Sequence, residues 1–267
     1  MRLAFVVLPL VCSMVAVVPQ RAAAAEANYH HLHLTAPNPE EAAQWYVKHM
    51  GCQAMASRKD AAMCGDVQML FYRRAPKGGS EGTGVHHIGF SYLDLAAKMR
   101  EFEANGVKIV RPMGDGRLKA GFVEDPWGTR IEVVEDPESL GLYHVHLHTP
   151  DPAATLKWYQ DAFGGQLAKR KITGLEGLLY GKLWVLATKP AAHELPLGPT
   201  DGRAVDHLGF SFANLDASVA ELKAKGLKFR EDVRTVTNAV GETLKITFLV
   251  GPDDVVIELV QPPPPRK

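Results

Sequence analysis

Cysteine is scarce in this chain, and neither sign of charge predominates. Its 267 residues include three cysteines, and 30 lysines and arginines are balanced by 30 aspartates and glutamates. Because there is no basic stripe and no interleaving of basic with aromatic residues, we expect neither nucleic acid nor an anionic membrane surface as a partner. Hydrophobic residues make up 46% of the chain, which is typical of a globular protein large enough for two domains. A small molecule is the expected partner.

Long hydrophobic runs are absent except at the N-terminus, where Arg2 precedes the largely apolar residues 3–18. That run is shorter than the roughly 20 residues that a membrane-spanning helix needs, and the alanines of residues 22–25 follow it. The pattern predicts a cleavable signal peptide over residues 1–25 rather than a membrane anchor. We therefore expect an exported protein, periplasmic or secreted, with no stable membrane insertion after cleavage.

Only Cys52 and Cys64 remain once the predicted signal peptide is removed. They are placed symmetrically about residues 58–60, which could form the turn of a hairpin. In an oxidising compartment the two thiols could form a disulfide across that hairpin. Two buried free thiols are the alternative, because the geometry of a cross-strand disulfide is demanding.

The sequence contains an internal duplication. A His-x-His-Leu stretch, two prolines, a Trp-Tyr pair and a glycine recur in the same order in both halves, and so do a His-x-Gly-Phe-Ser motif and a later Ile-Glu pair. The matching segments are residues 31–51 with 144–164, 87–91 with 207–211, and 131–132 with 257–258. Each half therefore carries His, His and Glu in one order, each on a predicted strand.

Each half divides again into two units that begin with a strand and a helix and continue with further strands. In the first unit, residues 29–35 are predicted to form a strand and residues 40–50 a helix that Asn38 caps and Gly51 ends. The third unit repeats this pattern of strand and capped helix, with Asp151 as the N-cap. Later segments such as residues 107–110, 121–124 and 129–134 are predicted strands separated by turns.

We predict an α+β fold of four βαβββ units grouped into two domains, at residues 28–136 and 142–262. The boundary falls in the polar residues 135–141. Two loops rich in glycine, proline and charge, residues 74–84 and 189–203, join the units and are expected to cover or line a site.

This organisation resembles the vicinal oxygen chelate superfamily, which includes glyoxalase I, extradiol dioxygenases and bleomycin resistance proteins. The most specific stretches are His-Ile-Gly-Phe at residues 87–90, the Asp-Pro-Trp-Gly turn at 125–128 and the duplicated Trp-Tyr pairs. In the second copy Asp254 replaces Gly128, and aspartate tolerates a left-handed backbone better than most residues. The resemblance covers residues 28–262 and implies two tandem half-barrel domains, each a cup with metal ligands pointing into it.

By this resemblance, each half binds one divalent metal ion, with Zn, Fe, Mn, Ni and Mg not distinguished. Two imidazoles and one carboxylate leave coordination positions open for substrate oxygens. The glutamates are also the candidate catalytic bases. The implied ligands are His31, His87 and Glu132 in the first cup, and His144, His207 and Glu258 in the second.

Other histidines share a strand face with these implied ligands. Alternation along a strand places His33 on the face of His31, and His146 and His148 on the face of His144. Any of them could bind metal, and the resemblance leaves them as residues that contact the substrate or orient a ligand. The histidines without a counterpart in the repeat are interpreted as surface or structural residues, and they are His30, His49, His86 and His193.

The function that we favour is that of a metal-dependent lyase, isomerase or epimerase acting on a small substrate with two neighbouring oxygens. An alternative is a ring-cleaving dioxygenase using Fe(II) or Mn(II), although Phe122 and Phe248 stand where that group carries a catalytic tyrosine. Glyoxalase I usually has a fourth metal ligand, and Gln68 is the nearest candidate for it in this sequence. Export also disfavours a glutathione-specific enzyme, because glutathione is mostly intracellular. The third possibility is a non-enzymatic small-molecule-binding protein. Both a monomer and a homodimer fit the sequence.

Overall fold

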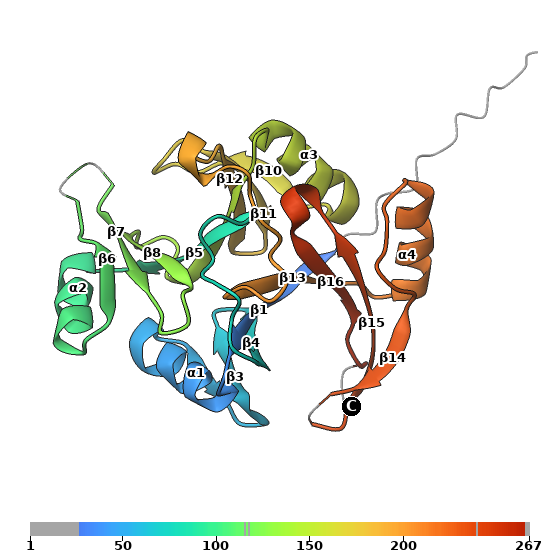
Figure 1. Ribbon diagram of the computed structural model, residues 1–267, viewed down its shortest axis with the longest axis horizontal. Coiled ribbons are helices and arrows are strands. Elements are labelled where there is room, and N and C mark those ends of the chain that lie inside the picture. The colour runs from blue at the N-terminus through green and yellow to red at the C-terminus, as the bar shows by residue number, and fades with distance from the viewer. Residues whose placement is uncertain (1–26, 115, 117, 239, 265–267) are drawn as a thin grey trace, which may run out of the picture.

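The computed structural model describes residues 27–114, 116, 118–238 and 240–264. The predicted signal peptide, residues 1–25, lies outside the described residues. The α+β class and the four successive βαβββ units are confirmed (Figure 1).

The first two units make up the N-terminal half. Unit 1 consists of β1 (Asn28–Ala36), α1 (Pro39–Trp45), the π-helical turn η1 (Tyr46–Met50), β2 (Gln53–Met55), β3 (Arg58–Cys64) and β4 (Val67–Arg73). Unit 2 consists of β5 (Val85–Tyr92), α2 (Leu95–Ala104), β6 (Lys108–Arg111), β7 (Ala120–Glu124) and β8 (Arg130–Glu135).

The C-terminal half repeats this order. Unit 3 consists of β9 (Gly141–His148), α3 (Pro152–Phe163), β10 (Gln166–Lys169), β11 (Glu176–Tyr180) and β12 (Leu183–Thr188), and the short 3-10 helix η2 (Ala192–Glu194) follows it. Unit 4 consists of β13 (Val205–Ser211), α4 (Leu215–Ala224), β14 (Arg234–Thr237), β15 (Thr243–Val250), the 3-10 helix η3 (Pro252–Asp254) and β16 (Val256–Gln261).

Two eight-stranded sheets form, and each combines one unit from each half of the sequence. Their strand orders are β14-β15-β16-β13-β1-β4-β3-β2 and β10-β11-β12-β9-β5-β8-β7-β6. Units 1 and 4 thus share one sheet, here called sheet 1/4, and units 2 and 3 share the other, sheet 2/3. The opening strands join the units, because β1 pairs antiparallel with β13 and β5 with β9 (Figure 1).

The helix ends follow from local sequence. The Asp94, Asp151 and Asn214 side chains each accept a hydrogen bond from the backbone N–H three residues later and so cap α2, α3 and α4. Asn38 stands at the predicted N-cap of α1 but forms no such bond. Gly51 ends the first helical segment at φ 78°, a left-handed conformation that suits glycine.

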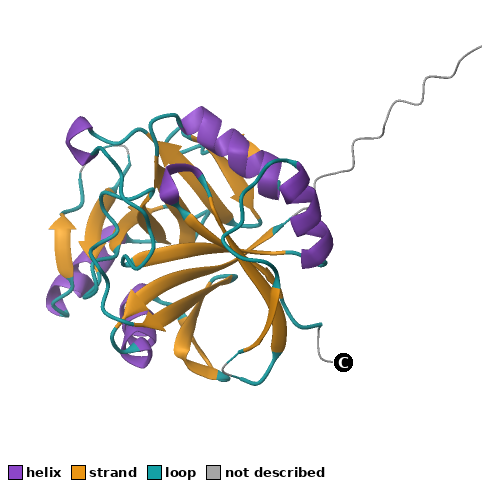
Figure 2. Ribbon diagram, turned by 45° about the vertical axis from the view of Figure 1, so that its right-hand side comes forward, coloured by secondary structure: helices purple, strands orange, loops and turns teal. Residues whose placement is uncertain are grey.

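The hydrophobic core lies on the sheet faces that carry the helices (Figure 2). Leu32 and Leu34 of β1 and Val145 and Leu147 of β9 are fully or almost fully buried there. Because side chains alternate along a strand, the histidines between these residues project from the opposite face. The helical face of each sheet therefore supplies packing, and the other face is left for chemistry.

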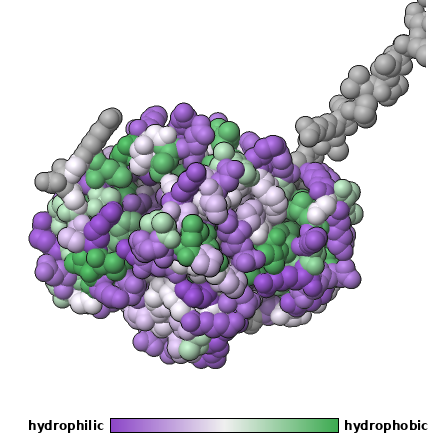
Figure 3. Space-filling model, turned by 45° about the horizontal axis from the view of Figure 1, so that its top comes forward, coloured by the Kyte–Doolittle hydropathy of each residue, from purple (hydrophilic) through white to green (hydrophobic). Residues whose placement is uncertain are grey.

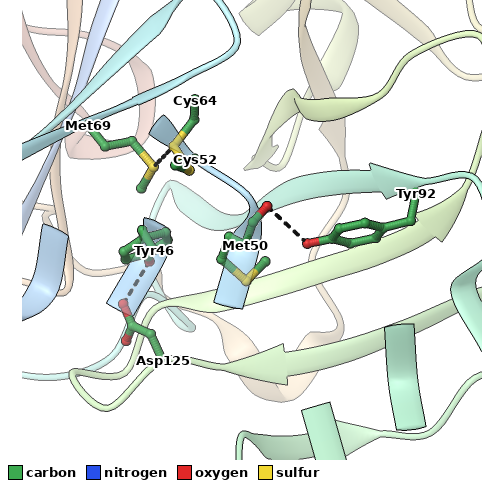
Figure 4. The surroundings of a disulfide bond; sticks show 7 residues. All are labelled: Tyr46, Met50, Cys52, Cys64, Met69, Tyr92 and Asp125. Atoms are coloured by element: carbon green, nitrogen blue, oxygen red, sulfur yellow. Dashed lines mark hydrogen bonds between the residues drawn. A yellow bond between two sulfur atoms is a disulfide. The ribbon is translucent and has the colours of Figure 1, made fainter. Parts of the chain in front are cut away.

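A disulfide joins Cys52 to Cys64, so the first of the two alternatives for these cysteines is the one observed (Figure 4). Cys52 immediately precedes β2 and Cys64 ends β3, so the bond ties the beginning of this hairpin to its end. Nearby, the Tyr46 hydroxyl donates a hydrogen bond of 2.7 Å to Asp125 Oδ2. That bond links the helical segment of unit 1 to the turn between β7 and β8 of unit 2.

The face shown in Figure 3 is largely hydrophilic, with hydrophobic residues in small separate patches. Of the helices in the described part of the chain, none has the length and hydrophobicity needed to span a bilayer.

Candidate metal centres

Three predicted ligands from units 1 and 4 converge at one point, here called site A. His31 on β1, His207 on β13 and Glu258 on β16 are all buried. Their atoms lie close together: His31 Nε2 is 3.4 Å from His207 Nε2, and Glu258 Oε2 is 3.2 Å from the first nitrogen and 3.0 Å from the second. Ligand atoms about 2.0–2.2 Å from a shared cation have spacings of this order.

A second convergence, site B, lies in sheet 2/3. Glu132 Oε2 on β8 is 3.8 Å from His87 Nε2 on β5 and 3.6 Å from His144 Nε2 on β9. The Nε2 atoms of His87 and His144 are buried and form no hydrogen bond with any described residue. Because buried polar atoms are rarely left without a partner, these two nitrogens are suited to binding a metal ion.

The grouping expected from the sequence is therefore wrong. His31 does not meet His87 and Glu132, and His144 does not meet His207 and Glu258. Instead, the two opening histidines are exchanged between sites, because β1 pairs with β13 and β5 pairs with β9. The duplication revealed the units and their ligand types, but it could not reveal which opening strands pair.

Strand register explains the convergence in both sites. His31 lies opposite Gly209, which in turn lies beside Glu258, and His144 lies opposite Gly89 beside Glu132. Each glycine leaves room for the imidazole across the strand pair, since a Cβ on Gly209 would lie 2.2 Å from His31 Cε1. The glycine of the His-x-Gly-Phe motif is thus a positioning residue. The sequence identified the motif, and the structure shows the role of its glycine.

A β-bulge precedes every one of the four ligand histidines. In the β1–β13 and β5–β9 pairings, one strand advances two residues while its partner advances one. Such bulges redirect side chains and are common beside active sites. The extra residues are His30, His86, Tyr143 and Asp206.

These bulges bring consecutive side chains together. His30 Nδ1 lies 2.9 Å from His31 Nδ1, and His86 Nδ1 lies 2.7 Å from His87 Nδ1. The interpretation of His86 as a surface residue is wrong, because it is buried, and both His30 and His86 contact a candidate ligand. Strict strand alternation would have placed His86 on the other face from His87, and the bulge overrides it.

Asp206 orients His207 in site A. Its Oδ1 lies 2.7 Å from His207 Nδ1, while its Oδ2 accepts a 2.7 Å hydrogen bond from Gly202 N and a further bond from Arg74. A carboxylate on the far nitrogen of a histidine fixes which nitrogen faces the metal and increases its basicity. This arrangement was not anticipated from the sequence.

The electrostatics favour metal binding by neutral imidazoles in site B. Burial lowers the pKa of His87 and of His144 well below the usual range, so both have a free lone pair at neutral pH. Burial also raises the pKa of Glu132. In site A, burial opposes ionisation of Glu258, but hydrogen bonds from His207 and His31 lower its pKa well below its usual value.

Both sites fit a divalent cation by their donor chemistry, with two imidazoles and one carboxylate each. Imidazole suits Zn, Fe and Ni, whereas Mg prefers all-oxygen surroundings. At site A, the group whose potential ligand atoms all lie within 4.8 Å of one another adds His33 to the three predicted ligands. At site B, the corresponding group is His87, His144 and His146, without Glu132.

Site A opens into a cavity of about 530 Å³. Met55 on one edge strand, β2, and Val236 on the other, β14, both line it, so this sheet is curled into a cup. Gln68 on β4 lies beside His31 in the parallel register and also lines the cavity. His33 lines it as well and stacks on Tyr72, with ring centroids 3.8 Å apart.

The surroundings of site B differ from those of site A. Trp184 takes the register position beside His144 that Gln68 takes beside His31. The buried Arg170 lies over the Tyr143 ring and pairs with Asp136. The cavity of about 490 Å³ next to Arg170 and Trp184 has no member of site B in its lining.

The two further histidines that share a face with His144, namely His146 and His148, lie along β9, away from site A. His146 Nε2 lies 2.9 Å from Thr188 Oγ1, and His148 Nδ1 lies 3.3 Å from Glu194 Oε2. Glu194 comes from the loop of residues 189–203, which pairs with the loop of residues 74–84 through the bridge between Thr83 and Gly198.

The family model of the Glyoxalase/Bleomycin resistance protein/Dioxygenase superfamily matches residues 28–133 and 141–259. The chain belongs to this superfamily, and the resemblance noted in the sequence is confirmed.

Curated relatives include lactoylglutathione lyases. The chain is 22% identical over 208 residues to that of Schizosaccharomyces pombe, a match spanning 67% of each protein. It is 32% identical over 94 residues to the probable chloroplastic enzyme of Arabidopsis thaliana, which spans 34% of this chain and 27% of that protein. Among solved structures, glyoxalase I from Zea mays shares the fold, with a TM-score of 0.67, 18% identity and coverage of 88% of this chain and 92% of that one.

Proposed function

We propose that the protein is a metal-dependent lyase or isomerase that acts at site A on a small molecule with two neighbouring oxygens. The observation that supports this most is that His31, His207 and Glu258 converge, and that His31 and Glu258 line a cavity of about 530 Å³ together with Gln68. Gln68 offers site A a further oxygen donor, and the tryptophan at that position in site B offers none.

The metal, when bound, supplies a Lewis acid that stabilises negative charge developing on the substrate oxygens. The protein's own residues do the rest. The imidazoles of His31 and His207 fix the Glu258 carboxylate at the inner end of the cavity, where it can take a proton from a carbon next to a carbonyl and return it to the neighbouring carbon. Leu70, Leu244 and Ile246 line the cavity and limit access of water to that proton.

Lactoylglutathione lyase activity is the first to test, because that name recurs among the relatives. The hemithioacetal of methylglyoxal and glutathione belongs in the screen with hemithioacetals of other thiols and with free vicinal dicarbonyl compounds. Substrates other than glutathione adducts are favoured if the protein is exported as residues 1–25 suggest, which fractionation of the producing cell would test.

The decisive comparison is between Glu258→Gln and Glu132→Gln. The first variant is expected to lose at least 10²-fold in turnover, the scale of one general base, together with about one equivalent of metal. The second is expected to retain turnover within a few-fold, because it changes the site in which Trp184 stands at the position of the oxygen donor Gln68. Equal loss in both variants would contradict the assignment to site A, and oxygen consumption with catechols would favour a dioxygenase instead.

A further inference from the structure

A third cluster of metal-binding side chains lies beside site B. His86 on β5 and His148 on β9 stack with ring centroids 3.9 Å apart, and Glu194 of η2 lies against both. Potential ligand atoms of these three residues all lie within 4.8 Å of one another. Neither sheet alone forms the cluster, because Glu194 belongs to the loop that joins units 3 and 4.

The spacing of the donors in this cluster fits a shared cation better than direct hydrogen bonds. His148 Nδ1 lies 3.3 Å from Glu194 Oε2, and His86 Nε2 lies 3.6 Å from Glu194 Oε1. Both separations exceed the usual hydrogen-bond range of about 2.7–3.2 Å, and His148 Nδ1 has no hydrogen-bond partner among the described residues. A tetrahedral zinc ion with bonds of about 2.0–2.1 Å separates its ligands by about 3.3–3.4 Å.

The carboxylate is held in position for this role. Glu194 Oε2 accepts a 2.8 Å hydrogen bond from Ala191 N, which orients the side chain toward the two imidazoles. Glu81 Oε1 lies 3.7 Å from His86 Nε2 and is paired with Arg130. Three donors thus lie close together, and a fourth lies at the outer edge.

We propose that His86, His148 and Glu194 form a third divalent-cation site, here called the rim site, which takes an imidazole-preferring metal such as zinc. Glu81 supplies the fourth ligand. Binding requires one of the stacked rings to turn so that both lone pairs meet at the ion. The cation would fasten the loop of residues 189–203 to β5 and β9.

The rim site and site B are linked through one proton. An imidazole that binds metal through Nε2 carries its proton on Nδ1, yet the Nδ1 atoms of His86 and His87 face each other at 2.7 Å. Only one of them can donate in that contact. A cation at the rim assigns the proton to His86 and so opposes metal binding by His87, which means that the rim site binds best when site B is empty.

The test therefore uses the double variant Glu132→Gln/Glu258→Gln, in which both cup sites are weakened. Titration with zinc chloride, followed by calorimetry, is expected to show about one remaining equivalent. Adding His148→Ala should abolish it, whereas His193→Ala, a change at the exposed neighbour of Glu194, should leave it unchanged. No remaining zinc, or zinc that survives His148→Ala, would overturn the proposal.

A second measurement does not depend on the double variant folding. Crystals of the Glu132→Gln protein soaked in zinc should show an anomalous peak between His148 Nδ1 and Glu194 Oε2. Absence of that peak at saturating zinc would refute the rim site. The proposed function fails by a different result, namely unchanged turnover in Glu258→Gln, so the two failures are distinguishable.

Discussion

Gly209 lies directly beneath the imidazole of His31, so close that an added methyl group would stand 2.2 Å from Cε1 of that ring. The same relationship joins Gly89 to His144, at 2.1 Å. The smallest residue thus decides where a ligand from a different unit can lie.

Replacing Gly209 by alanine should displace His31 and weaken metal binding at site A. We expect a loss of about 10–100-fold in metal affinity, the range found when residues that orient ligands are changed, and a parallel loss of turnover. The matched control is Gly89→Ala, which disturbs His144 in site B. Competition with a fluorescent chelator measures the affinities, and comparable turnover losses in both variants would argue against this division of roles.

Asp206→Asn should reduce metal affinity at site A by about 10–100-fold. The substitution removes the negative charge that faces His207 Nδ1, and it presents an amide to the donors Gly202 N and Arg74. Arg74→Gln, which leaves the carboxylate in place, should have a smaller effect in the same direction. If Arg74→Gln lowered the metal affinity of site A more than Asp206→Asn does, Asp206 would not act through His207.

Reducing the disulfide should lower the free energy of unfolding by about 2–4 kcal/mol, since Cys52 and Cys64 close a short loop and restrict the unfolded chain. Urea unfolding with and without a thiol reductant measures this difference. The variant Cys52→Ser/Cys64→Ser should match the reduced protein and should not respond to the reductant. A response of that variant would show that the reductant acts elsewhere, for instance on bound metal.

Asp125 should make stability depend on pH. Burial raises its pKa from 3.8 to about 6, partly offset by hydrogen bonds from Thr129 and Tyr46. An acid whose pKa is raised on folding stabilises the fold while it is protonated, so its contribution is complete below pH 3.8 and is lost as the pH rises through about 6.

The comparison with Asp125→Asn isolates this effect. Asparagine can still accept from Trp127 N and Thr129 N, which both donate to Oδ1. Between about pH 4 and pH 7, the wild-type chain should lose about 3 kcal/mol of unfolding free energy relative to the variant, from a shift of about two pKa units. Parallel pH profiles for the two proteins would contradict the raised pKa.

The sequence was sufficient to predict the four units and the residue types of the ligands. It was not sufficient to predict which ligands come together in one site. Caps such as Asp151 act over a few residues, so the helices could be predicted from local pattern. The partner of His31 depends on whether β1 pairs with β5 or β13, and four similar units offer no local signal for that choice. The contact between His86 and His87 depends on a β-bulge. Regular alternation of side chains along a strand would place these two residues on opposite faces, so the contact could not be predicted from it.

The strand order also sets when each cup is completed as the chain emerges during synthesis. Sheet 2/3 is continuous in sequence, from β5 to β12, and it is whole once the middle of the chain has been made. Site A instead joins His31, near the beginning, to Glu258, near the end. Site A can therefore form only after β16 has been synthesised. The cup that contains site A is the last part of the molecule to become functional.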